Sequence, residues 1–308
     1  MERRTITIVG PGAVGCALAA ELTRAGAAVS LLDYRPARAA ALTRDGITIE
    51  DGESVWTVPV PSEADPAALG PADLAIVLCK AYATSGAVAS ALPCIGPRTA
   101  VLTLQNGLGN HEAISELVAA ERVLAGTIVM GATTLGIGRV RLSGTGPIVL
   151  GSPAGNTALA LQAADLLGAY FSPVQHEADI EAALWRKVIV NAAVNPLTAL
   201  TGLLNGELLD SPELRGTLAA LVAEAVAVAT AAGLRPFEGD AVAAVEQVCR
   251  ITGRNRSSML QDVAAGRPTE IEQICGEIAR RGEKVGVVTP LCRAMVALVK
   301  GLKKPATG

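Results

Sequence analysis

Short apolar runs alternate with helical segments through the first half of the chain. Most of these runs lack polar alternation, which is typical of parallel strands that are covered by helices on both faces. The predicted strands are residues 5–10, 27–33, 74–80, 100–107 and 122–130, and residues 139–153 have the pattern of a hairpin. We therefore expect an α/β fold whose N-terminal part is a doubly wound parallel sheet of the Rossmann type.

The second half has a different pattern, because strand candidates disappear after about residue 156 and long Ala/Leu-rich segments follow. This pattern predicts an all-helical C-terminal domain. We expect residues 1–174 to form a dinucleotide-binding domain and residues 175–308 to form a helical substrate domain. The long apolar run at 217–234 is interrupted by Glu224, and a buried helix explains such a run better than a membrane span.

One predicted helix in the second half carries three polar residues on an otherwise apolar surface. Each residue of an α-helix advances by about 100°, so Lys187, Asn191 and Asn195 form one narrow stripe. Such a stripe should face something polar, and the alternative is a solvent-exposed edge of a mostly buried helix. If Pro196 continues the helix, it leaves the carbonyl of Ala192 without its usual donor and bends the chain.

The composition narrows the class of function. The 308 residues are 50% apolar and 18% charged, with a formal net charge of −3 and a pI of about 5.6. This balance argues against binding to nucleic acid or to a membrane and favours small-molecule chemistry. The six cysteines contain no CxxC pair and only two histidines are present, so we expect reduced cysteines and no metal site. An apolar run begins too soon after Met1 for a signal peptide, which predicts a cytoplasmic protein.

The sequence GPGAVG follows the first predicted strand and opens a helical segment. In this position Gly10 permits a tight turn, Gly12 lets a pyrophosphate approach the backbone, and Gly15 allows close packing of helix on strand. Together with Ala13 and Val14, these glycines are the predicted phosphate-binding loop of a nicotinamide nucleotide. The alternative is a glycine turn with a structural role alone.

Three further predicted strands end in polar residues. Asp33 lies where an acidic residue accepts hydrogen bonds from the adenosine ribose, which favours NAD, whereas Arg35 and Arg38 would pair with the 2′-phosphate of NADP. Lys80 and Asn106 end two later strands, and ligands of an open parallel sheet bind beyond the carboxyl ends of its strands. The alternatives are a capped turn at Asp33, solvated arginines, a solvated lysine and a turn asparagine.

The helical half contains two more groups of polar residues that are candidates for a site. Asn205 lies in a turn between two predicted helices, and Ser257 and Ser258 open another helix after a basic loop. Glu270 begins an apolar helical segment. Simple helix capping is the alternative interpretation, and it applies more to Ser257 than to Glu270.

Taken together, these motifs resemble the ketopantoate reductase (2-dehydropantoate 2-reductase) family. The matching segments are GPGAVG, CKAYAT, LQNGLGN, WRKVIVNAAVNPLTAL, LNGEL, and SSMLQD followed by TEIE, in the same order and spacing along nearly the whole chain. The resemblance implies an N-terminal Rossmann domain, a C-terminal helical domain and an active site in the cleft. It also implies NADPH-dependent reduction of ketopantoate to pantoate in pantothenate and coenzyme A biosynthesis.

The resemblance also assigns roles to residues. It makes Lys187 the proton donor to the substrate carbonyl oxygen, with Glu270 beside it. The implied ligands of the substrate, some of them shared with the nicotinamide, are Lys80, Asn106, Asn191, Asn195, Asn205 and Ser258. Many relatives carry an arginine at the end of the second strand, where this chain has Asp33 and Tyr34, with Arg35 one position later. NADP(H) is therefore the cofactor favoured by the resemblance, and NAD(H) is the alternative that Asp33 supports.

Two rival interpretations remain from the sequence. The chain could reduce another branched 2-oxo acid, or it could be a non-catalytic protein that senses a nucleotide. A sensor needs the glycine loop but has no need of a proton donor such as Lys187. The Ala-rich helices would suit the surface of a homodimer.

Overall fold

The computed structural model describes residues 4–52 and 54–302 and divides into two compact units. The first unit consists of Met1–Gln105 and Asn110–Ile180, and the second of Asn106–Gly109 and Glu181–Gly308. The division follows Ile180 rather than residue 174 because the short strand β10 (Val174–His176) pairs with the sheet of the first unit. That strand also corrects the expectation that no strand follows residue 156.

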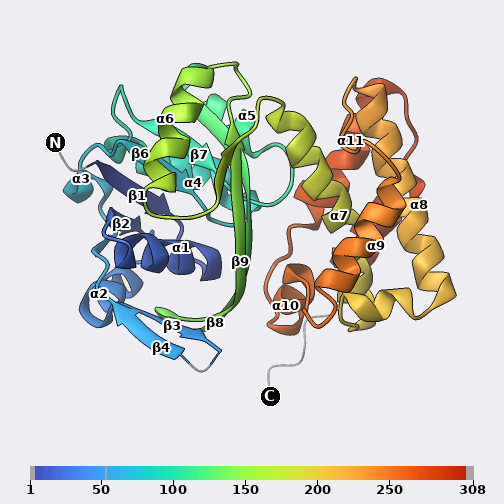
Figure 1. Ribbon diagram of the computed structural model, residues 1–308, viewed down its shortest axis with the longest axis horizontal. Coiled ribbons are helices and arrows are strands. Elements are labelled where there is room, and N and C mark those ends of the chain that lie inside the picture. The colour runs from blue at the N-terminus through green and yellow to red at the C-terminus, as the bar shows by residue number, and fades with distance from the viewer. Residues whose placement is uncertain (1–3, 53, 303–308) are drawn as a thin grey trace. The chain divides into compact units, whose positions relative to one another are not determined.

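The first unit is built on a 10-stranded sheet with the order β4-β3-β9-β8-β7-β6-β1-β2-β5, and β10 pairs with β9 (Figure 1). The part β5-β2-β1-β6-β7-β8 is parallel and has the doubly wound Rossmann order, as the sequence predicted. The remaining strands are β1 (Thr5–Val9), β2 (Ala28–Leu32), β3 (Ile47–Asp51), β4 (Ser54–Val58), β5 (Ser62–Glu63), β6 (Leu74–Val77), β7 (Ala100–Thr103), β8 (Val123–Gly136) and β9 (Arg139–Gly151).

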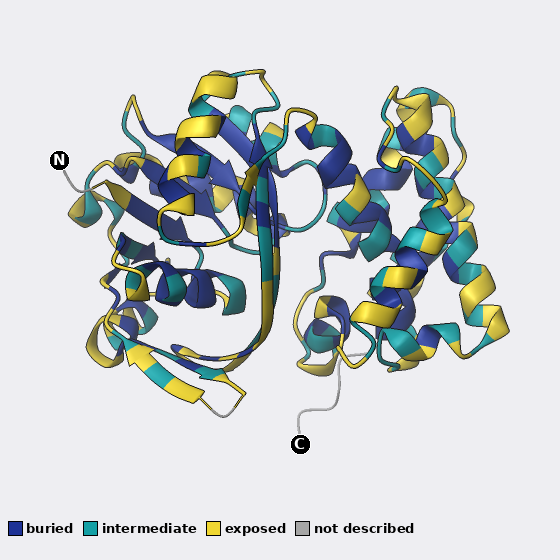
Figure 2. Ribbon diagram, in the orientation of Figure 1, coloured by how far each residue is buried: buried dark blue, intermediate teal, exposed yellow. Residues whose placement is uncertain are grey.

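Helices cover both faces of the parallel part, which explains why its strands lack polar alternation. In β6, Leu74 and Ile76 pack into the core that α1 (Ala13–Arg24) and α6 (Thr157–Gly168) cover, whereas Ala75 and Val77 face α4 and α5. Figure 2 shows the central strands buried and the edge strand β4 largely exposed. The other helical segments of this unit are α2 (Pro36–Asp45), α3 (Pro66–Leu69), η1 (Ala81–Ala83), α4 (Thr84–Ala91), η2 (Leu92–Cys94), α5 (Asn110–Ser115) and η3 (Ala120–Arg122).

The predicted hairpin at 139–153 is wrong, and strands β3, β4 and β5 were missed. Residues 139–151 form the single strand β9, which runs antiparallel to β8. The glycines read as a turn instead accommodate irregular pairing: register shifts interrupt the β8–β9 ladder, and a Cβ at Gly146 would lie 3.0 Å from the Val129 side chain. A glycine in a strand therefore marks a bulge or a close approach here.

The second unit is helical, as predicted. Its elements are α7 (Ile180–Thr201), η4 (Gly206–Leu209), α8 (Pro212–Ala231), α9 (Ala241–Ile251), α10 (Ser258–Ala264), the π-helical turn η5 (Glu272–Gly276), α11 (Glu277–Val285) and α12 (Pro290–Lys300). Helix α7 continues through Pro196. None of the six cysteines, all of which lie within the described residues, forms a disulfide bond, and five of them are buried.

Helix α8 contains most of the apolar run that Glu224 interrupts. Among the residues that the structure describes, it is the one helix long and apolar enough to cross a membrane, a test that core helices of soluble proteins also pass. The sequence predicted a buried helix, whereas the structure buries 33% of the most apolar 18-residue window of α8. Glu224 has a structural role: its carboxylate accepts hydrogen bonds from the backbone amides of Leu291 (2.7 Å) and Cys292 (2.9 Å) and so caps α12.

We expect Glu224→Ala to lower the free energy of unfolding by about 2 kcal/mol, because two backbone amides at the start of α12 lose a charged acceptor. Urea denaturation followed by circular dichroism measures the change. Glu116→Ala, which removes an exposed carboxylate, is the control and should stay within about 0.5 kcal/mol of the parent. Equal losses in the two variants would show that the cap contributes nothing specific.

Candidate active site

The glycine loop lies at the point of the sheet where the strand order reverses, between β1 and β6. Gly10 has φ +97°, and a Cβ there would lie 2.5 Å from the backbone nitrogen of Cys79. A Cβ at Gly12, in contrast, would meet nothing within 4 Å. Gly10 is thus required by the fold, whereas Gly12 leaves open space beside the backbone.

The start of α1 is suited to an anion. Gly12 is the N-cap of this helix, and no side chain caps the amides that follow it or places an acidic group in the first turn. Ala13 and Val14 are half-buried, and a Cβ at Gly15 would lie 2.5 Å from the carbonyl oxygen of Gly10. Uncapped amides at a helix N-terminus, with open space in front of Gly12, fit the pyrophosphate of a dinucleotide.

Asp33 is fully buried at the end of β2, and its carboxylate is already bound by neighbouring groups. The backbone amide of Arg35 donates to Oδ1 at 3.1 Å, and the Arg38 guanidinium forms an ion pair with Oδ2. Arg35 and Tyr34 are exposed, with the Arg35 guanidinium 5.4 Å from the Tyr34 ring centroid. Of the two arginines predicted to read a 2′-phosphate, Arg38 therefore neutralises Asp33, while Arg35 presents its charge at the surface.

Lys80 is half-buried and follows β6, next to the residue that Gly10 contacts. Sequence reasoning missed Gln105, which holds this strand end in place. The buried Gln105 amide donates to the Cys79 carbonyl at 2.8 Å and to the Thr84 hydroxyl at 2.9 Å, and it accepts from the Thr103 hydroxyl at 2.9 Å. The available signal was a polar residue at the end of an apolar strand, directly before Asn106.

In the second unit, the structure brings Lys187 and Glu270 together. Lys187 projects from α7 and is partly buried, and Glu270 is 6% exposed. Burial lowers the pKa of Lys187 from 10.5 to about 8, and the negative charge of Glu270 opposes this shift. The ammonium group is therefore mostly charged at pH 7, yet it releases its proton far more readily than a surface lysine does.

Asn106 completes this cluster, which we call the lysine cluster (Lys187, Glu270 and Asn106). It belongs to the short segment Asn106–Gly109 that forms part of the second unit. Its side-chain amide donates to Oε2 of Glu270 at 3.5 Å, the long end of the hydrogen-bond range. The cluster unites residues that are 164 positions apart in the sequence.

The polar stripe on α7 is not a solvated edge. Asn191 is partly buried and Asn195 is 6% exposed. One turn further on, Thr198 is completely buried, and its hydroxyl lies 2.7 Å from that of Ser257. The sequence did not single out Thr198, although it continues the stripe at helical spacing.

Two of the candidates in the helical half have capping or packing roles. Ser257 accepts a hydrogen bond from the amide of Leu260 at 3.1 Å and caps α10, so its capping interpretation is confirmed, whereas Ser258 is exposed in the first turn. The side-chain amide of Asn205 donates to the Thr252 hydroxyl at 3.0 Å. Its role as a substrate ligand stays a prediction.

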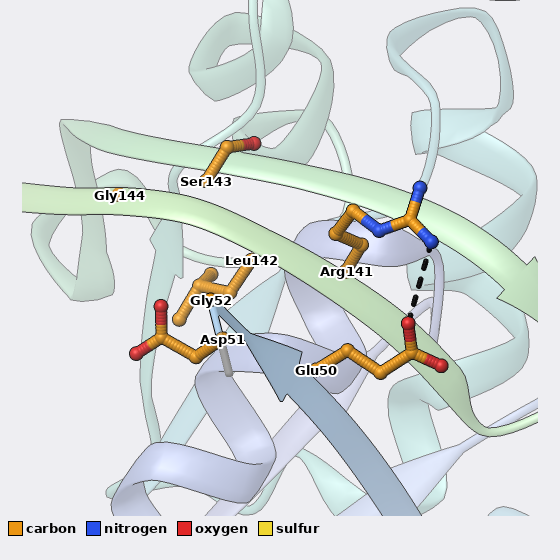
Figure 3. A pocket seen from close by; sticks show the side chains of 7 residues that line it. All are labelled: Glu50, Asp51, Gly52, Arg141, Leu142, Ser143 and Gly144. Atoms are coloured by element: carbon orange, nitrogen blue, oxygen red, sulfur yellow. Dashed lines mark hydrogen bonds and ion pairs between the residues drawn. The ribbon is translucent and has the colours of Figure 1, made fainter. Parts of the chain in front are cut away.

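The first unit also contains a hollow. It is lined by residues 50–52 at the end of β3 and by residues 141–144 of β9, with Arg141 bound to Glu50 (Figure 3). None of the predicted site residues lines it. In residues 4–52 and 54–302, no group of three or more His, Cys, Asp or Glu side chains is arranged to hold a metal ion.

Comparison with known families gives two matches that together span most of the chain. Residues 6–155 match the family described as "Ketopantoate reductase PanE/ApbA", and residues 179–303 match "Ketopantoate reductase PanE/ApbA C terminal". The chain is 34% identical to the 2-dehydropantoate 2-reductase of Halobacterium salinarum over 298 residues, which cover 96% of this chain and 97% of that relative.

Solved structures resemble the chain over nearly its full length. The 2-dehydropantoate 2-reductase of Geobacter metallireducens is 30% identical, with a TM-score of 0.90 and coverage of 96% of this chain and 99% of that one. A D-mandelate dehydrogenase, determined with NADH and anilino(oxo)acetate, is 28% identical, with a TM-score of 0.90 and coverage of 96% and 97%. These proteins share the fold and differ in the substrates that their names state.

We expect Glu270→Gln to lower the pKa of Lys187 below about 8, because the variant removes the negative charge that opposes the effect of burial. A brief pulse of acylating reagent is applied at each pH of a series, and mass spectrometry measures the fraction of Lys187 that is acylated. The midpoint, which is the pH of half-maximal acylation, reports the pKa of Lys187. The midpoint should move to lower pH in Glu270→Gln. Acylation of Lys284, an exposed residue of α11, serves as the internal reference. An unchanged Lys187 midpoint would mean that Glu270 does not set its charge.

Proposed function

Because the chain belongs to the ketopantoate reductase family, we propose that it reduces ketopantoate to pantoate with NADPH, in the cytoplasm, as a step of pantothenate biosynthesis. The observation that carries this proposal is the lysine cluster, in which burial lowers the pKa of Lys187 to about 8 beside Glu270. A 2-oxo acid reductase needs a proton donor of this kind at the oxygen that receives the proton.

NADPH held at the glycine loop would supply the hydride that the carbonyl carbon of the substrate receives. As negative charge develops on the carbonyl oxygen, the Lys187 ammonium stabilises it and transfers a proton from Nζ, which completes the hydroxyl group of the product. Glu270 keeps Lys187 charged before the transfer, and Asn106 binds the Glu270 carboxylate. Lys187 then regains a proton from solvent, which restores the resting state.

The amides on α7 suit the rest of the substrate. Asn191 and Asn195 donate or accept hydrogen bonds without adding charge, as a ligand with hydroxyl, carbonyl and carboxylate groups requires. We assign these two residues, together with Ser258 and Asn205, to substrate binding. Gly10, Gly12, Ala13, Val14, Gly15 and Lys80 are assigned to the nucleotide.

The preference for NADPH rests on the end of β2. Asp33 is buried and paired with Arg38, so its carboxylate is less available to ribose hydroxyls than the sequence suggested. The exposed guanidinium of Arg35 is the group we assign to the 2′-phosphate. The second candidate function is an NADH-dependent reduction of another 2-oxo acid, which the similarity to D-mandelate dehydrogenase favours.

We expect Lys187→Ala to lower kcat with ketopantoate by about 100- to 10,000-fold, because the variant lacks the proton donor. The KM for NADPH should change little. In the parent, kcat should fall as pH rises through about 8, since Lys187 loses its proton there. Initial rates of NADPH oxidation across a pH series measure both effects, with Lys284→Ala as the surface control. An active Lys187→Ala variant would remove the lysine from the mechanism.

We expect Arg35→Ala to lower kcat/KM for NADPH by about 10- to 100-fold and to leave the value for NADH nearly unchanged, since a charged contact to a phosphate is lost. Arg44→Ala, at an exposed site on the same helical segment, is the matched control. Rates with ketopantoate and a panel of other 2-oxo acids, each with both cofactors, test substrate and cofactor together. Higher activity with NADH and another 2-oxo acid would favour the second candidate function.

A further inference from the structure

Pro196 leaves a gap in the backbone hydrogen bonds of α7. A residue with an N–H at this position would donate to the carbonyl of Ala192, one turn earlier, and proline has no such donor. Ala192 is fully buried, so water is a poor substitute as a partner. The carbonyl lies next to Asn191, in the part of α7 that carries the polar stripe.

The Cys275 thiol occupies the place of the missing donor. Its sulfur lies 3.8 Å from the carbonyl oxygen of Ala192, in hydrogen-bond range for a thiol, and Cys275 is fully buried. A thiol is a weak hydrogen-bond donor, and its burial without a strong acceptor costs little free energy. Cys275 thus links α7 to the π-helical turn η5.

The turn η5 also contacts the segment that carries Asn106. The carbonyl of Gln273 accepts a hydrogen bond from the Leu108 amide at 2.9 Å. Gly107 has φ +87°, and a Cβ there would lie 2.4 Å from the same carbonyl oxygen. The segment therefore lies directly on the turn. Gln273 contacts this segment through its backbone carbonyl, whereas Cys275 contacts α7 through its side chain.

Glu270 lies two residues before the turn, and the amide of Ile274 within the turn donates to the Glu270 carbonyl at 3.1 Å. One short turn consequently contacts or adjoins every element of the lysine cluster. Single π-helical turns occur frequently at functional sites.

We propose that Cys275 is a positioning residue of the reductase: its thiol replaces the N–H that Pro196 lacks and fixes the part of α7 that carries Lys187 and Asn191 against the turn that follows Glu270. The proposal rests on the proposed function for its kinetic effect. Cys275 touches no reacting atom in this scheme, and it acts through the backbone of Ala192.

A double-mutant cycle between Cys275→Ala and Pro196→Ala tests the link, since an alanine at 196 restores the N–H for the Ala192 carbonyl. In the parent, Cys275→Ala should lower kcat with ketopantoate by about tenfold or more, because a misplaced proton donor is costly, and leave the KM for NADPH unchanged. In the Pro196→Ala background the same change should lower kcat by less than about threefold. Cys275→Ser, which retains a donor, should retain most of the activity.

Cys249→Ala is the matched control, because Cys249 is equally buried and lies on α9 of the same unit. It should lose stability without losing kcat. The pH midpoint of Lys187 acylation supplies a second readout and should move in Cys275→Ala but not in Cys249→Ala. If Cys275→Ala does not fold, Cys275→Val keeps the apolar volume without the donor and takes its place.

Three results would overturn the proposal. The first is an equal kcat in Cys275→Ala and Cys249→Ala, and the second is an equal kcat in Cys275→Ser and Cys275→Ala. The third is that Cys275→Ala lowers kcat by the same factor whether residue 196 is proline or alanine. A parent protein that turns over no 2-oxo acid would instead refute the proposed function. The acylation midpoints alone then decide whether Cys275 positions Lys187.

Discussion

Lys187 and Glu270 carry opposite charges in an apolar helical unit. The balance between the burial of Lys187 and its attraction to Glu270 sets how readily the lysine gives up its proton. Burial alone disfavours the ammonium group, and the carboxylate restores part of its stability, so that the pKa of Lys187 settles near 8. A lysine fully in water would hold its proton too firmly, and one buried without a carboxylate would lose its charge at neutral pH. The site therefore depends on the placement of Glu270, two residues before η5, where its charge acts on Lys187 of α7.

Other contacts in the second unit pair polar groups that a helix end or a proline leaves without an intrahelical partner. Glu224 binds the first amides of α12, and Ser257 caps α10 while its hydroxyl meets that of Thr198 on α7. The Cys275 thiol binds the carbonyl beside the proline. Each of these contacts gives a polar group its hydrogen-bond partner and also joins two helical elements. Because an unpaired buried polar group is costly, the same contacts hold the helices in position.

The first unit has a glycine loop at the start of α1 that carries no charged side chain in its first turn. The start of α1 is left uncapped, Gly12 is open, and Gln105 ties the end of β6 in place through its amide. The charge is concentrated at the end of β2, where Arg38 neutralises the buried Asp33 and Arg35 remains exposed. The sequence predicted Asp33 as a ribose ligand, whereas the structure pairs its carboxylate with Arg38.

The sequence by itself determined the features that depend on local periodicity and on short motifs. Unbroken apolar runs predicted the parallel strands, the glycine spacing predicted the tight turn that opens α1, and helical spacing placed Lys187, Asn191 and Asn195 on one stripe. Tertiary structure decided the features that depend on partners distant in sequence. It decided that Arg38 neutralises Asp33, that 139–151 is one strand paired with β8, that Asn106 meets Glu270, and that Cys275 meets the carbonyl freed by Pro196. Periodicity indicates which face of a helix or strand is buried. The group that covers that face comes from a distant part of the chain, so only the folded structure shows which group it is.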